Sequence, residues 1–71
     1  MFGKGDVVKW KWGDGYGRGT VQSAFTRMVT RKINGETVVR HGSKGNPAYY
    51  IVSDDANNVL KLLSELEPAG D

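Results

Sequence analysis

The chain contains no cysteine and only one histidine among its 71 residues. The absence of cysteine excludes a disulfide framework and any thiolate metal site. His41 alone cannot supply the ligand set of a structural zinc site, so we expect no metal and no other cofactor. Small secreted domains usually depend on disulfides, and this composition therefore favours a cytoplasmic location.

Long apolar runs are also missing. The opening residues, MFGKGDVVKWKWG, contain no apolar segment of signal-peptide length, so we expect neither a secretion signal nor a membrane span. The length predicts one domain over residues 1–71, with residues 68–71 as a frayed tail. A domain of this size buries only about 60% of its unfolded surface, so its core is thin.

Charge is distributed unevenly along the chain. Residues 1–50 carry nine Lys and Arg against three acids, a net charge of +6, whereas residues 51–71 carry one Lys against five acids, a net charge of −4. Such a split can mark an electrostatic footprint for a partner. Folding can equally interleave the two halves into a solvated surface of mixed sign.

Glycines recur at every second position of KWKWGDGYGRGTV, from Gly13 to Gly19. The register of a dinucleotide-binding fingerprint, G-x-G-x-x-G, fails from each starting glycine, and a strand pattern follows instead of a helix. No G-K-S/T completes a phosphate loop either. The stretch is therefore predicted to be a turn at Gly13–Gly15, with Gly19 permitting a sharp bend in the next strand.

Alternation with a period of two predicts an all-β fold. GDVVKWKW places Val8, Trp10 and Trp12 on one face of a strand, and a second, long strand is expected from near Arg18 through residue 33. Asn34-Gly35 predicts a hairpin turn, because both central positions need positive φ. The strand after it is expected over residues 36–40, and YYIVS predicts another. The expected core is Val8, Trp10, Val21, Tyr49, Ile51, Leu62 and Leu66.

The segment VLKLLSELEP is ambiguous. Its leucines have helical spacing, but VLKLL also suits a strand followed by one helical turn at SEL. In both cases, short strands separated by turn signals predict a small SH3-like or Tudor-like barrel of about five antiparallel strands. We also expect a long hairpin extension after the second strand and a short helical turn near the C-terminus.

No catalytic constellation is evident. His41 is the only usual base at neutral pH, and Ser43, two residues away, shows no sign of activation. Asp54-Asp55 lacks the spacing of a calcium loop. We therefore expect no enzymatic activity.

Aromatic residues are numerous for this length and exceed what a small core needs. Trp12, Tyr16 and Tyr50, with Arg18 nearby, are the candidate binding surface, because exposed rings can stack on bases or bind a cation. The alternative is that they cover an open end of the barrel. If the rings converge, with Asp14 or Asp54 as the acid, they could form a methyl-lysine cage.

Basic residues supply a second candidate surface. They lie along and after the predicted hairpin, where they could track a phosphate backbone or keep exposed sheet edges soluble, and they are Arg27, Arg31, Lys32, Arg40 and Lys44.

The opening FGKGDVVKWKWGDGYGRGTV resembles the hypervirulence-associated protein Tudor domains of bacteria and fungi. The resemblance continues through NPAYYI and the end around Asp54, Lys61, Glu65 and Leu66, so it covers nearly the whole chain. It departs where the family often has Ala-His-Lys and this chain has VLKLL, and in the extra Trp12 and Tyr16. The resemblance implies a five-stranded Tudor-like barrel and no activity, because the molecular role of the family is largely unassigned.

These observations favour a non-catalytic interaction module, expected to be monomeric, that binds a peptide or other partner through exposed aromatics. The alternative is a nucleic-acid-binding domain that uses the basic hairpin.

Overall fold

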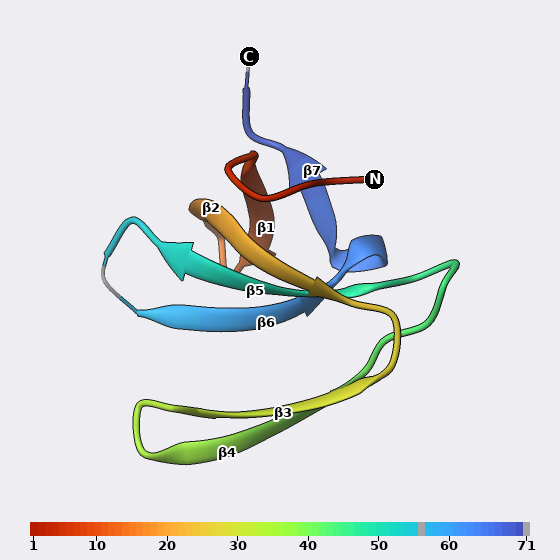
Figure 1. Cartoon of the computed structure of the whole chain (residues 1–71). Helices are drawn as coiled ribbons and strands as arrows, with labels where there is room; N and C mark the ends of the chain where they lie inside the picture. The colour runs from red at the N-terminus through yellow and green to blue at the C-terminus, as the bar shows by residue number, and fades with distance from the viewer. Residues whose placement is uncertain (56, 71) are drawn as a thin grey trace.

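The computed structural model describes residues 1–55 and 57–70, which form strands almost throughout (Figure 1). A single turn of 3-10 helix, η1 (Leu63–Glu65), is the helical element of these residues. The strands are β1 (Val7–Trp12), β2 (Gly15–Phe25), β3 (Met28–Ile33), β4 (Glu36–His41), β5 (Ala48–Ser53), β6 (Asn58–Leu62) and β7 (Leu66–Pro68).

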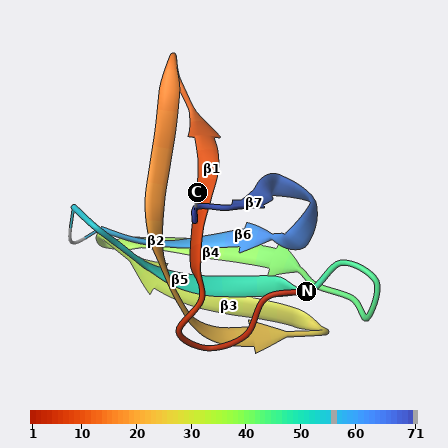
Figure 2. The ribbon, with the colours of Figure 1, turned by 90° about the horizontal axis from the view of Figure 1, so that it is seen from above.

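Two antiparallel sheets make up the fold. The larger sheet has the strand order β6-β5-β2-β1-β7, and β3 and β4 form a separate two-stranded ribbon. Figure 2 shows the β1–β2 hairpin standing steeply out of the layer that contains β5 and β6. The all-β antiparallel class is confirmed. The larger sheet keeps β6 and β7 as edges in the described residues, so a closed barrel is not confirmed.

β2 bends strongly where it passes from β1 to β5. Gly19 allows this approach, because a Cβ there would overlap the Val52 carbonyl oxygen and the Ile51 side chain. The pairing of β2 with β5 also shifts register between Val21 and Ser23, which is a bulge that adds twist. Figure 2 shows β2 curving along its length, and the sharp bend at Gly19 itself stays a prediction.

The expectation of one strand from Arg18 through residue 33 is wrong. The chain leaves the larger sheet after Phe25, and β3 begins at Met28 as part of the ribbon. At the end of the ribbon opposite the Asn34-Gly35 turn, the Gly42 N–H donates to the Arg27 carbonyl oxygen at 3.2 Å. This backbone hydrogen bond joins the segments that enter and leave the ribbon. The alternation of side chains over residues 18–33 does not indicate that the chain passes from one sheet to another.

β5 is buried on both faces, and this divides the core in two. Tyr49 and Ile51 pack with Val8, Trp10, Val21 and Leu66 in the first cluster. Ala48 points the other way and joins Val29 and Leu60 in a second cluster beneath the ribbon. Of the expected core, Leu62 belongs to this second cluster and is only half-buried. Val29 and Leu60 are core residues that sequence patterning missed.

The two hairpin turns follow their local sequences. Asn34 and Gly35 have φ values of 52° and 82°, so the predicted Asn-Gly turn is confirmed, with Ile33 opposite Glu36. Trp12 is opposite Gly15, so Gly13 and Asp14 make the first turn, and β2 starts before Arg18. Gly13 takes a positive φ of 55°.

The C-terminal segment takes the strand-and-turn form of the two forms considered. β6 is followed by η1, and β7 pairs with β1. Pro68 ends β7, and the buried Ala69 donates its N–H to the Val7 carbonyl at 3.2 Å. Residues 68 and 69 are therefore held in place by β1, contrary to the frayed tail expected for residues 68–71. Asp71 lies outside the described residues.

Candidate functional site

The four residues of the predicted aromatic surface lie in different places. Cross-strand partners share a face, so Tyr16, opposite Lys11, lies on the outer face of the β1–β2 hairpin, and Arg18, opposite Lys9, shares that face. Trp12 lies on the inner face with Trp10. Tyr50 belongs to β5.

The sequence predicted that Tyr50 belongs to an exposed binding surface, and the structure does not place it on one. It is half-buried against the second cluster, and its hydroxyl accepts a hydrogen bond of 2.7 Å from Asn58 Nδ2. The β3–β4 ribbon covers this face of β5, and the sequence did not predict that cover. Tyr16 is 56% exposed, and Lys9 Nζ lies 4.7 Å from its ring centroid.

Trp12 is 72% exposed although it follows directly on the buried strand face of Val8 and Trp10. Trp12 is the last residue of β1, and its side chain lies beyond the buried cluster that covers Val8 and Trp10. Trp12 and Tyr16 therefore point to opposite sides of one hairpin, and with Tyr50 under the ribbon the three rings form no cage.

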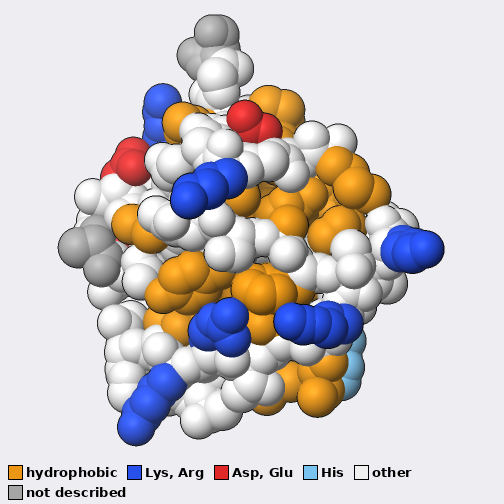
Figure 3. Space-filling view, viewed as in Figure 1, with side chains coloured by type: hydrophobic (Ala, Val, Ile, Leu, Met, Phe, Trp, Pro, Cys, Tyr) orange, Lys and Arg blue, Asp and Glu red, His pale blue; other side chains and the backbone are white. Residues whose placement is uncertain are grey.

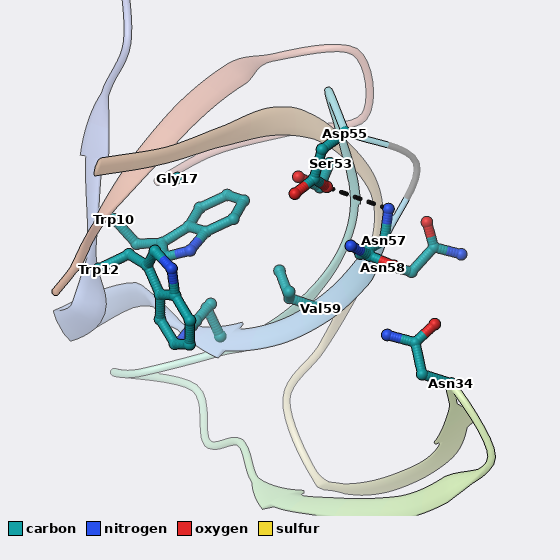
Figure 4. A pocket seen from close by; sticks show the side chains of 10 residues that line it. Trp10, Trp12, Gly17, Asn34, Ser53, Asp55, Asn57, Asn58 and Val59 are labelled. Atoms are coloured by element: carbon teal, nitrogen blue, oxygen red, sulfur yellow. Dashed lines mark hydrogen bonds between the residues drawn. The ribbon is translucent and has the colours of Figure 1, made fainter. Parts of the chain in front are cut away.

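A pocket opens beside Trp12 on the inner face. It encloses about 300 Å³. Figure 4 shows the two indoles on one side of it, a group of polar side chains from the β5–β6 turn on the other, and Val59 between them. The lining residues are Trp10, Trp12, Gly17, Asn34, Ser53, Asp55, Asn57, Asn58, Val59 and Lys61.

The aromatic wall of the pocket depends on glycine. Trp10 is opposite Gly17 across the β1–β2 pair, and a Cβ on Gly17 would overlap its indole. The indole therefore lies over the glycine and stays buried, at 4% exposure. This packing fixes the inner wall, and Trp12 continues it outward toward solvent.

The polar wall carries a fixed negative charge. Hydrogen bonding with the Ser53 side chain and the Asn57 backbone N–H lowers the pKa of Asp55 below its ordinary value. The Asn57 N–H donates to Asp55 Oδ1 at 3.1 Å, as the dashed line in Figure 4 marks. Asp55 is therefore ionised at neutral pH. The acids named from the sequence lie elsewhere: Asp14 is in the first turn, and Asp54 pairs with Arg18 at 3.8 Å.

Most of this polar wall was missed from the sequence. Asp55, Asn57 and Asn58 come from one turn that sequence patterning treated only as a loop. Asn34 reaches the pocket from the tip of the ribbon, and no local pattern connects it to Trp12. The one available signal was the density of Asp and Asn in DDANN, a composition that forms turns with several free side-chain oxygens.

The predicted basic residues do not form one stripe. Arg27 and Arg31 both lie over the Phe25 ring, at 5.8 and 4.9 Å from its centroid, and Arg40 forms an ion pair with Glu65. Lys32 points to the opposite face of the ribbon from Arg31, and Lys44 lies in the loop after β4. Figure 3 shows basic side chains separated from one another by hydrophobic and uncharged surface.

The described residues contain no group of three or more His, Cys, Asp or Glu side chains placed to hold a metal ion. His41 is exposed at the end of β4, and the Ser43 hydroxyl accepts a hydrogen bond from the Asn46 backbone N–H at 3.2 Å. Within residues 1–55 and 57–70, no helix has the length and apolar character to cross a membrane.

Fold and surface together define a small all-β domain with an aromatic pocket. Residues 5–66 match the family described as the hypervirulence associated proteins TUDOR domain, and the chain belongs to that family. The resemblance stated from the sequence is confirmed. No curated protein and no solved structure matches the chain. TUDOR domains are generally non-catalytic binding folds, so membership suggests a binding module.

Proposed function

We propose that this domain is a non-catalytic interaction module that binds a peptide segment of a partner protein at the pocket beside Trp12. The observation that carries the proposal is the 72% exposed indole of Trp12 at the rim of a pocket with one aromatic wall and one polar wall. Most of the Trp12 surface is in contact with solvent, so the fold buries little of this large apolar side chain. Tryptophan is, in turn, strongly enriched among the residues that dominate binding energy at interfaces.

The two walls favour a ligand with both apolar and polar groups. The indoles of Trp10 and Trp12 offer apolar area, while Asp55 and the amides of Asn34 and Asn58 offer hydrogen-bonding groups. Binding pockets commonly combine apolar walls with a few polar groups that fix orientation. A peptide provides both kinds of group along one short segment.

A binding experiment with a matched control tests the proposal. Dodecapeptides are selected from a phage-displayed random library on the immobilised domain, and their affinities are measured by isothermal titration calorimetry. Trp12→Ala is expected to weaken binding at least tenfold, the size of effect seen at interface hot spots. Tyr16→Ala removes an exposed ring from the opposite face and should leave the affinity unchanged. Failure to select any peptide, or equal affinities for wild type and Trp12→Ala, would overturn the proposal.

The nucleic-acid alternative has less geometric support, because Arg27, Arg31, Lys32, Arg40 and Lys44 are divided among several environments. It predicts binding to oligonucleotides that falls steeply with salt. A titration of the domain against single- and double-stranded oligonucleotides at low salt distinguishes the two functions. We propose further that the domain acts as a monomer in the cytoplasm, which sedimentation and localisation of a tagged chain would test.

A further inference from the structure

The tip of the β3–β4 ribbon joins an asparagine to a glycine. Asn34 and Gly35 are both exposed, and they take φ values of 52° and 82°. Asparagine is a thermolabile residue, because its side-chain Cγ can be attacked by the backbone nitrogen of the residue that follows. The attack closes a cyclic imide and releases ammonia. The ribbon tip therefore holds the two groups that this reaction needs.

The backbone nitrogen of Gly35 is accessible. The β3–β4 ladder ends at the pair of Ile33 and Glu36, and no backbone carbonyl of residues 1–55 and 57–70 accepts the Gly35 N–H. A Cβ at Gly35 would have no heavy atom within 4 Å apart from those of its chain neighbours. Glycine itself has no Cβ that would hinder the approach to its nitrogen. The nitrogen is thus unshielded on the side from which Cγ approaches.

The side-chain amide of Asn34 is unrestrained in the part of the chain that the structure describes. The amides of Asn46 and Asn58 are held by hydrogen bonds to Ser64 and Tyr50. No such bond holds Asn34 among the described residues, and Figure 4 shows its side chain at the tip of the ribbon. Its Cγ can therefore turn toward the next backbone nitrogen without breaking a hydrogen bond.

The other asparagines provide a comparison within the same chain. Asn34 is followed by a glycine, Asn57 by an asparagine, Asn58 by a β-branched valine and Asn46 by a proline. A bulky side chain on the following residue hinders attack by its nitrogen, and the proline nitrogen has no proton to lose. We therefore expect Asn34 to react first and Asn46 not to react.

We propose that Asn34 is a site of spontaneous deamidation in the folded domain. Hydroxide removes the Gly35 amide proton as the nitrogen attacks Asn34 Cγ. A C–N bond forms, and the side-chain nitrogen takes a proton from water and leaves as ammonia. Water then adds to one of the two carbonyl carbons of the cyclic imide and breaks the bond from that carbon to the imide nitrogen. The overall reaction consumes one water molecule and releases one ammonia molecule.

The reaction has two products, because the imide has two carbonyl carbons. Opening at Cγ gives aspartate with an unchanged main chain. Opening at the backbone carbonyl carbon gives isoaspartate, in which the main chain passes through Cβ and Cγ and is longer by a methylene group. The turn sets Ile33 opposite Glu36, and the geometry of such a turn depends on its length. The isoaspartate form is therefore the less stable of the two.

Both products add a carboxylate to the opening around Trp12. Asn34 lines the pocket of the proposed function and also a second cavity of about 450 Å³ between the ribbon and β6. The charged side chains that line the two cavities are Glu36, Asp55, Arg40 and Lys61. These two acids and two bases balance, so the added carboxylate makes the lining net negative. The deamidation itself does not depend on the proposed function.

Peptide mapping of the aged domain tests the proposal. The wild-type domain is incubated in mildly alkaline buffer, and samples are digested with trypsin and analysed by tandem mass spectrometry. Residues 33–40 lie between two trypsin sites, so Asn34 is followed in a peptide of its own. We expect this peptide to gain the mass of an acid in place of an amide, faster than the peptide with Asn57 and Asn58, while Asn46 stays intact. An unaged sample digested in parallel measures conversion during digestion.

Variants distinguish the cyclic route from direct hydrolysis. Asn34→Gln keeps an amide but places its carbonyl carbon one bond further from the backbone, so it should lose the modification. Asn46→Gln is the matched control and should leave the conversion of Asn34 unchanged. Isoaspartate should form together with aspartate and should unfold at a lower denaturant concentration than Asn34→Asp, which carries the charge without the longer main chain. Aspartate formed alone would indicate direct hydrolysis and would overturn the cyclic route.

Comparison with the unfolded chain tests whether the folded ribbon permits the reaction. An exposed turn opens at little cost in free energy, so the native rate should lie within about tenfold of the rate in guanidinium chloride. Conversion that occurs only in the unfolded chain would show that the turn protects Asn34, and this result would overturn the proposal. An intact Asn34 in a sample in which Asn57 or Asn58 has converted would overturn it as well.

Discussion

The indole of Trp10 lies over Gly17 on the neighbouring strand so closely that a Cβ on Gly17 would overlap the ring. Two features of the sequence that first look unrelated, a tryptophan in an alternating strand and a run of spaced glycines, are therefore one packing unit. The glycine provides the space that the tryptophan fills. This unit forms the inner wall of the pocket, so the stability of the first hairpin and the shape of the site depend on the same contact.

Gly17→Ala is expected to destabilise the domain by about 1–3 kcal/mol, because the added methyl group would force the Trp10 ring out of a packed position. Urea unfolding followed by circular dichroism measures the change. Gly15→Ala is the control: Gly15 is in the same strand, has negative φ and has open space around its Cβ position. Its free energy of unfolding should change by less than about 0.5 kcal/mol. Equal effects at the two sites would contradict the packing described here.

The two tryptophans should give different fluorescence signals. Trp10 is 4% exposed and Trp12 is 72% exposed. Trp12→Phe should leave a protein with blue-shifted emission and weak quenching by acrylamide, because only the buried ring remains. Trp10→Phe should leave red-shifted emission that is strongly quenched. If both variants were quenched to the same extent, Trp12 would be covered in solution, and the proposed binding surface would lose its basis.

Local signals predicted the fold better than they predicted the site. The strand alternation of Val8 and Trp10 and the Asn34-Gly35 turn depend on neighbouring residues, and both appear as expected. The split of residues 18–33 into two strands depends on which sheet each half joins. That choice is set by pairing with β5, which lies more than 20 residues away in sequence, so periodicity cannot reveal it.

The candidate site shows the same limit. Exposure of Trp12 and Tyr16 follows from their positions at a hairpin end, but their opposite orientations depend on the cross-strand register. The pocket needs Asn34 from the ribbon and Asp55 from the β5–β6 turn to lie near Trp12. No pattern within one strand encodes this, because the ribbon could have folded over either face of the sheet. The family resemblance supplied the class of fold but none of these positions.

The Asn34-Gly35 turn should be sensitive to the loss of glycine. Gly35 has a φ of 82°, a conformation that residues with a Cβ rarely adopt. Gly35→Ala should lower the free energy of unfolding by about 1–2 kcal/mol, whereas Gly45→Ala, at a glycine with open space and negative φ, should have little effect. Thermal unfolding of both variants checks this. A Gly35→Ala variant as stable as Gly45→Ala would indicate that the ribbon turn differs from the one described.

Glu65 links the ribbon to the C-terminal turn and should make part of the stability depend on pH. Burial raises the pKa of this carboxyl, but the hydrogen bond from Arg40 and the bond from the Leu62 N–H together outweigh burial, so its pKa lies below the ordinary value. A depressed carboxylate pKa stabilises the fold above the unfolded-state pKa, and this stabilisation is lost as pH falls through the folded-state pKa. Because the pair is partly exposed to solvent, we expect it to contribute less than about 1 kcal/mol.

Glu65→Gln tests this directly, because the amide keeps the shape of the side chain and can still accept the Leu62 N–H. Wild type should be more stable than Glu65→Gln at neutral pH, and the difference should shrink as the solution is acidified below the ordinary pKa of glutamate. Urea unfolding across this pH range measures both. The exposed Glu67→Gln, which removes one carboxylate from the neighbouring strand β7, is the matched control for the loss of a surface charge. A stability difference between wild type and Glu65→Gln that stayed constant on acidification would show that the Arg40 ion pair does not stabilise the folded chain.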